Sequence, residues 1–163
     1  MTATELLNFL REFYREKLTM LHRHVAAARY VSNYEFNNTY QYVIAREEMH
    51  VSWVAAAVQD MGGQLETVPE PEIHVSGKGI EAQNTLIAQD RDAAQAFVDK
   101  WRPRVETMKH ARHRTMLNVI LGETLEHKRF FEQALAGRDD LLGRRADGAG
   151  TGGGVLPTRW IEQ

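Results

Sequence analysis

The chain has 163 residues and a formal net charge of −2, so it is long enough for one domain with a buried core and gives no electrostatic case for binding nucleic acid or an anionic membrane. It contains no cysteine, which excludes disulfides, thiolate metal sites and a cysteine nucleophile. Residues 1–10 lack the basic start and apolar run of a signal peptide, and no run of about 18 apolar residues could span a membrane. We therefore expect a cytoplasmic globular protein.

Four long segments have apolar residues at the three-and-four spacing of amphipathic helices. These helices are expected over residues 4–31, 35–61, 80–101 and from 106 or 110 to 136. Thr2 or Thr4 is expected to cap the first helix. Pro103 is expected to break or kink the third helix.

A long connection over residues 62–79 contains Pro69 and Pro71 together with several glycines, so it is not expected to be helical. At about 3.3 Å per residue, an extended link can span the whole second helix, whose length is about 40 Å. The chain would then start its second half at the same end of the molecule. This predicts an all-α four-helix bundle over residues 1–137, with two antiparallel hairpins joined by one long crossover, as in ferritin-like folds.

Residues 138–163 differ in composition from the helical part. Glycines make residues 143–154 a flexible linker, and a short apolar piece with Trp160 follows. We consider this piece a candidate docking segment for a neighbouring subunit or a partner protein. Packing on its own bundle and disorder are the alternatives.

Polar residues interrupt the apolar stripes of the first predicted hairpin at matching depths. Glu47 and His50 stand in the stripe of the second helix and, being three residues apart, leave the same helix face. Glu16 interrupts the stripe of the first helix. Because the midpoint of Glu16 and Glu47 falls at the turn between these helices, the two carboxylates are expected to meet across the hairpin.

The second predicted hairpin has the same pattern. Asp90 interrupts the third helix and Glu123 the fourth, and their midpoint falls in the break that follows Pro103. One turn after Glu123, either Glu126 or His127 continues the stripe. Four acidic side chains are thus expected to converge at one level of the bundle.

Buried carboxylates at one level repel one another and cost several kcal/mol each unless they are paired or coordinate metal ions. Hard carboxylate oxygens with one or two imidazoles suit iron or manganese. In helical bundles, such sites take one Glu from each of two helices and Glu-x-x-His from the other two. The pattern therefore predicts a buried metal site.

Two stretches resemble a known family. Residues 46–50, Arg-Glu-Glu-Met-His, followed by an apolar stretch to Gly62-Gly63, resemble the second helix of ferritin-like proteins, rubrerythrins above all, and residues 122–130 resemble their fourth helix. The likeness covers roughly residues 5–136. It implies a bridged centre of two iron ions, with manganese as the alternative, in which Glu47 and Glu123 bridge the metals. The metal ligands expected are Glu16, Glu47, His50, Asp90, Glu123, and Glu126 or His127.

The resemblance implies an oxidoreductase, a ferroxidase or a peroxidase, acting on ferrous iron with oxygen or on peroxide. A tyrosine such as Tyr14 or Tyr40 is expected near the metals. Since the chain has no rubredoxin domain, its electron donor would be a separate and unknown partner. We expect a homo-oligomer, a dimer.

Several less specific interpretations stay open. Glu47 and His50 could be a structural pair in a polar layer, and Glu16 could be an edge charge whose carboxylate reaches water. His22 and His24 are expected to have solvated or capping roles rather than to bind metal. His110 and His113 are expected at the surface.

Two other functions also fit the residues. The histidines would suit a DinB-like bundle that uses a single divalent ion without redox chemistry. A metal-free interaction protein, with the C-terminal tail as its working part, is the third hypothesis.

Overall fold

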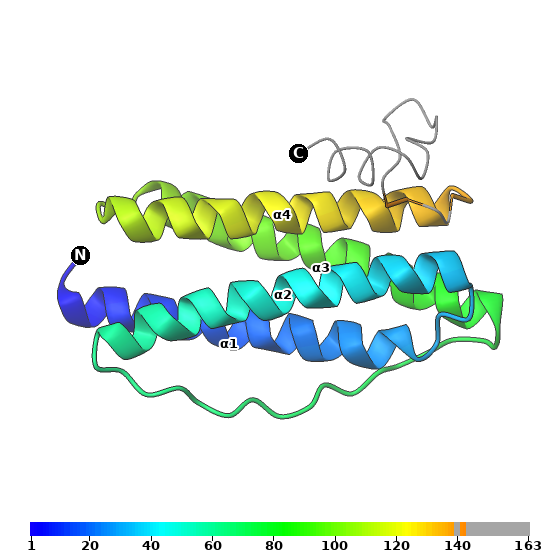
Figure 1. Cartoon of the computed structure of the whole chain (residues 1–163), viewed down its shortest axis with the longest axis horizontal. Coiled ribbons are helices and arrows are strands. Elements are labelled where there is room, and N and C mark those ends of the chain that lie inside the picture. The colour runs from blue at the N-terminus through cyan, green and yellow to red at the C-terminus, as the bar shows by residue number, and fades with distance from the viewer. Residues whose placement is uncertain (139–140, 143–163) are drawn as a thin grey trace, which may run out of the picture.

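The computed structural model describes residues 1–138 and 141–142, and over these residues the chain forms four α-helices and no strand. The helices are α1 (Ala3–Ala28), α2 (Tyr34–Asp60), α3 (Ile80–Glu106) and α4 (Ala111–Leu135). Figure 1 shows α1 and α2 as one antiparallel hairpin, α3 and α4 as another, and the connection between them running outside the bundle from one end to the other. The predicted all-α four-helix bundle is confirmed. Most of the predicted tail lies outside the described residues.

Side-chain caps fix where the first two helices begin. The hydroxyl of Thr2 accepts a hydrogen bond from the Glu5 amide at 3.1 Å, and the Glu5 carboxylate accepts one from the Thr2 amide at 2.6 Å. The Asn33 side chain accepts one from the Phe36 amide at 2.8 Å. These bonds satisfy amides that have no partner inside the helix.

Pro103 does not end α3, contrary to the prediction, because the helix continues through it to Glu106. A proline near the end of a helix removes only one hydrogen bond, to the carbonyl four residues earlier. The last turn is held by Trp101 and Val105, which are both fully buried. The fourth helix then begins only at Ala111.

The core consists of two apolar clusters separated by a polar layer. The first cluster holds the rings of Phe13 and Trp101, whose centroids lie 5.0 Å apart edge to face. The second holds Tyr40 and Phe131, with centroids 5.5 Å apart. The buried polar side chains between the clusters, which we call the polar layer, are Lys17, His24, Glu47, His50, Asp90, Thr124 and His127.

The crossover lies against α1 and α3. Arg11 of α1 donates a hydrogen bond to Glu66 at 2.6 Å, and Gln89 of α3 donates one to the His74 carbonyl at 3.3 Å. Ile73 and Val75 pack against the second apolar cluster. These contacts hold an extended segment along the bundle. Within the described part of the chain, no helix has both the length and the apolarity to cross a membrane.

Candidate functional site

On both α1 and α4, a buried polar residue lies one position after a carboxylate that was predicted to be in the core. Lys17 is 0% exposed, as is Thr124, whereas Glu16 and Glu123 lie at the edge of the bundle. Residue 16 and residue 17 both continue a three-and-four pattern from Phe13, so spacing alone could not decide between them. Lysine can enter because its long stem is apolar and its ammonium finds a buried partner.

Glu47 of α2 is the centre of the polar layer. Its Oε2 lies 3.0 Å from Nζ of Lys17, and both side chains are 0% exposed. The Lys17 ammonium also donates a hydrogen bond to Thr124 Oγ1 at 3.1 Å, and the Thr124 hydroxyl donates one to the Ile120 carbonyl at 2.8 Å. The buried carboxylate is therefore neutralised by a buried lysine.

Two imidazoles face the other oxygen of the same carboxylate. Nδ1 of His24 lies 2.8 Å from Glu47 Oε1, and Nδ1 of His127 lies 3.9 Å from it. The 2.8 Å contact is within hydrogen-bond distance but is not aligned as one, so it is an electrostatic contact. Within the described residues, both Glu47 oxygens and Nδ1 of His24, His50 and His127 are buried without a directional hydrogen bond.

The charges of the layer follow from burial and from these contacts. Burial alone would raise the pKa of Glu47, but the attraction of Lys17, His24 and His127 outweighs it and lowers this pKa far below its usual value. Burial would lower the pKa of His24, but the adjacent Glu47 carboxylate raises it. Burial lowers the pKa of His127 to about 3 and also lowers that of His50. At neutral pH, His127 and His50 are neutral.

Asp90 of α3 is held at one end of the layer. Its Oδ1 accepts a hydrogen bond from Nε of Arg23 at 2.8 Å, and its Oδ2 accepts one from the Tyr40 hydroxyl at 2.5 Å. Nε2 of His24 lies 4.0 Å from Oδ1. Burial, and then the Asp90 charge, raise the pKa of Tyr40 well above its ordinary value. Asp90 thus links a buried tyrosine to His24.

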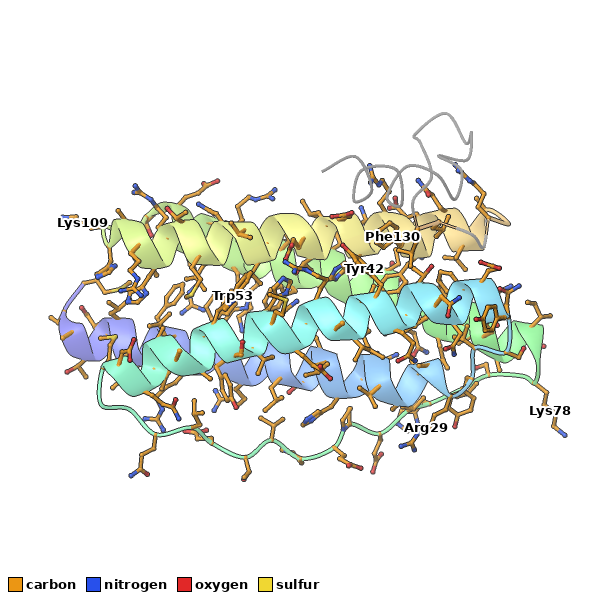
Figure 2. The ribbon with its side chains drawn as sticks, in the orientation of Figure 1. Arg29, Tyr42, Trp53, Lys78, Lys109 and Phe130 are labelled. Carbon is orange, nitrogen blue, oxygen red and sulfur yellow. The ribbon has the colours of Figure 1, made fainter. Side chains whose placement is uncertain are left out.

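On the side between α2 and α4, the layer reaches towards solvent through Glu123. This carboxylate contacts His50 Nε2 with one oxygen and Arg46 with the other, and its side chain is 24% exposed. Burial would raise the pKa of Glu123, but these two contacts lower it. Figure 2 shows Tyr42 and Trp53 of α2 directed towards α4 on this side.

The remaining predicted ligands lie outside the layer. Glu16 accepts a hydrogen bond from the indole Nε1 of Trp101 at 2.7 Å and pairs with Lys100. Glu126 is half-buried on α4. There it lies near Tyr42, whose pKa is raised by burial and then by this carboxylate. Of the seven predicted ligands, Glu47, His50, Asp90 and His127 are in the polar layer.

The predicted carboxylates do not form the arrangement that two metal ions need. Four of the five have a cationic partner, and these pairs are Glu16–Lys100, Glu47–Lys17, Asp90–Arg23 and Glu123–Arg46. The charge that metal ions were expected to offset is offset by the protein itself. In the described ranges, no group of three or more histidines and carboxylates is placed so that it could hold a metal ion. These residues therefore do not fit a bridged two-ion centre.

Sequence reasoning missed three members of the layer: Lys17, His24 and Thr124. His24 was expected to be solvated or capping, but it is 1% exposed. The burial of His24 could have been predicted, because residues 13, 17, 20 and 24 continue one three-and-four series on α1. His110 is exposed and His113 half-buried near the start of α4.

Comparison with known proteins gives this chain no family. No family model matches it, no curated protein matches it, and no solved structure matches it. The resemblance to ferritin-like proteins and the metal ligation inferred from it stay predictions.

Proposed function

We propose that the protein is an iron-dependent oxidoreductase that holds a single ion on Glu47, His24 and His127. The observation that supports this proposal is the pair of imidazole nitrogens facing Oε1 of one buried carboxylate, without directional hydrogen bonds. Buried polar atoms in native proteins have a partner, and buried imidazole nitrogens without a directional hydrogen bond favour an ion or a water there. The three side chains come from three helices, so a bound ion would also tie the hairpins together.

As they stand, the three side chains are not placed to hold an ion, so the proposed site requires an adjustment. With metal–ligand bonds of roughly 2.1 Å, neighbouring ligand atoms lie about 3.0–3.4 Å apart. The two observed separations from Oε1, 2.8 Å and 3.9 Å, fall on either side of this range. A shift of about half an ångström at the His127 ring would bring the longer one to this range.

Neighbouring groups support these three ligands. Ligating histidines commonly donate their second ring N–H to a carboxylate, and Asp90 Oδ1, 4.0 Å from Nε2 of His24, would have to come about 1 Å closer to accept it. Lys17 holds the far oxygen of Glu47, which leaves Oε1 as the single oxygen directed at the imidazoles. His50 and Glu123 form a polar contact between the layer and solvent and could exchange a proton there.

The ligand set indicates the chemistry. Two histidines and one carboxylate are typical of non-haem iron(II) sites, where open positions admit oxygen or peroxide and the iron supplies electrons. A single-ion site retains the redox activity expected from the sequence and needs fewer carboxylates. Manganese shares most of these ligand preferences.

The test is an anaerobic iron(II) titration with elemental analysis of the loaded protein. We expect close to one iron per chain, loss of that iron in Glu47→Gln, and full retention in Glu16→Gln, which makes the same change at a rim carboxylate. His24→Gln and His127→Gln should each weaken binding by about tenfold or more, as expected for removal of one ligand.

Three results would overturn the proposal of a single-iron oxidoreductase. Two irons per chain, lost together in Glu16→Gln and Glu47→Gln, would restore the bridged centre predicted from the sequence. Binding of neither iron nor manganese to the wild-type chain would leave the polar layer as a metal-free ion-pair network. Zinc bound in preference to iron, with no oxygen consumption, would favour the non-redox alternative.

A further inference from the structure

A pocket of about 670 Å³ opens on the side of the bundle where the crossover runs over α1 and α3. Its floor includes Met20 and Phe97, its wall includes Ala93 and Ala96, and residues 68–71 of the crossover form its roof. This volume lies within the range of small-molecule sites, and such sites are mostly apolar. None of the proposed metal ligands lines it.

The cationic side chains that line the pocket, Arg15 and Lys100, are already paired. Arg15 lies 3.3 Å from Glu66, and Lys100 pairs with Glu16. Among the described residues that line the pocket, no cation is therefore left unpaired to receive an anionic ligand. Glu70, which is exposed at the roof, adds a negative charge that disfavours anions further. The charge balance and the apolar floor both favour an uncharged occupant.

We propose that this pocket binds an uncharged, largely apolar small molecule of two or three rings. Its rings would lie on the side chains of Met20 and Phe97, under the roof residues Val68 to Pro71. Aromatic and thioether side chains make favourable contacts with such rings. The Phe97 ring also packs against the Lys17 ammonium, whose Nζ lies 5.3 Å from the ring centroid, so this ring contacts both the pocket and the polar layer. The proposal does not depend on metal binding.

The test compares two fluorescent probes that differ in charge. N-phenyl-1-naphthylamine is uncharged, and 8-anilino-1-naphthalenesulfonate has the same rings with an added sulfonate. The full-length chain should bind the uncharged probe at least tenfold more tightly than the sulfonate. Equal or tighter binding of the sulfonate would overturn the proposal and indicate an anion site.

Two matched variants test whether the uncharged probe binds in this pocket. Ala96→Phe fills the pocket from α3, whereas Ala56→Phe makes the same change at an exposed position of α2 that does not line it. We expect at least a tenfold loss of affinity for the uncharged probe in Ala96→Phe and less than a twofold change in Ala56→Phe. Equal effects in the two variants, or no effect in Ala96→Phe, would show that the probe binds elsewhere.

A third measurement addresses the chain's own apolar C-terminal segment as an occupant. Deletion of residues 143–163 should leave the affinity for the uncharged probe within twofold of the full chain. A rise of tenfold or more after the deletion would mean that this segment competes for the pocket, and would overturn the proposal of a small-molecule ligand.

Discussion

Two neighbouring residues of α1 form ion pairs in very different surroundings. In one pair α1 supplies the acidic partner, and in the other it supplies the basic partner. Glu16 pairs with Lys100 at the rim, where the two side chains are 32% and 45% exposed, whereas Lys17 pairs with Glu47 in the core, where both are 0% exposed. The chemistry of the pairs is the same. Burial, and not the presence of an ion pair, therefore decides what each pair contributes to stability and function.

The two pairs should differ in how much stability is lost when one partner is removed. At the rim, water solvates a charge that loses its partner, so the pair contributes little. In the core, removing one partner leaves an uncompensated buried charge, which is strongly destabilising. Three substitutions and a change of pH test this difference between the core and the rim.

The largest effect is expected for Lys17→Met, which nearly preserves the shape of the side chain and removes its charge. The metal-free variant should lose about 3–5 kcal/mol of the free energy of unfolding, because Glu47 stays buried without its cation. Urea unfolding measures this loss. Iron(II) should restore much of it by replacing the ammonium charge, while Lys100→Met should change stability by less than about 1 kcal/mol. Equal losses in the two variants would contradict the comparison.

Asp90→Asn should have the next largest effect. The variant keeps the size of the side chain but loses the charged acceptor of the bonds from Arg23 and Tyr40. We expect a loss of about 1.5–3 kcal/mol, as for a buried hydrogen bond to a charged group. Thermal unfolding under matched conditions checks it. An unchanged melting temperature would mean that Asp90 contributes no net stability.

Acid should destabilise the metal-free protein. The pKa of His127 is lowered to about 3 in the folded chain, and that of Glu47 is also lowered. Below pH 6.5 the unfolded chain therefore binds protons that the folded chain does not bind. The raised pKa of His24 opposes this trend, because its contribution is present at low pH and is lost as pH rises. We expect a net loss on the order of 1–3 kcal/mol between pH 6.5 and pH 4. Urea unfolding at several pH values measures it, and His127→Phe should flatten the dependence.

The smallest effect is expected for Glu16→Gln. The amide oxygen can still accept the Trp101 indole hydrogen bond, and only the partly exposed contact with Lys100 loses its charge. Stability should change by less than about 1 kcal/mol in urea unfolding. A loss as large as that of Lys17→Met would show that the rim carboxylate has a role that its exposure does not suggest.

The fold was largely predictable because its signals are local. Apolar residues at helical spacing gave the number of helices, and the glycines and prolines of residues 62–79 gave the crossover. The helix ends were less predictable, since packing of Trp101 and Val105 carried α3 past Pro103. A local helix-breaking signal was outweighed by tertiary packing there.

The candidate site was predictable only in part. The depth of the polar layer and the burial of Glu47, His50, Asp90 and His127 agree with the sequence analysis. Which of two adjacent residues enters the core is decided by partners on other helices, and those partners are unknown from the sequence. Lys17 is inside because Glu47 and Thr124 are there to receive its ammonium.

The crossover does not by itself fix the register of one hairpin against the other along the bundle. Lys17 of the first hairpin donates a hydrogen bond to Thr124 of the second, and Arg23 of the first donates one to Asp90 of the second. If one hairpin slid by a helical turn, about 5.4 Å, the Lys17 ammonium would meet either the apolar Ile120 or the like charge of Lys128. Polar contacts at mid-length thus select one register of the two hairpins, whereas apolar contacts alone would permit several.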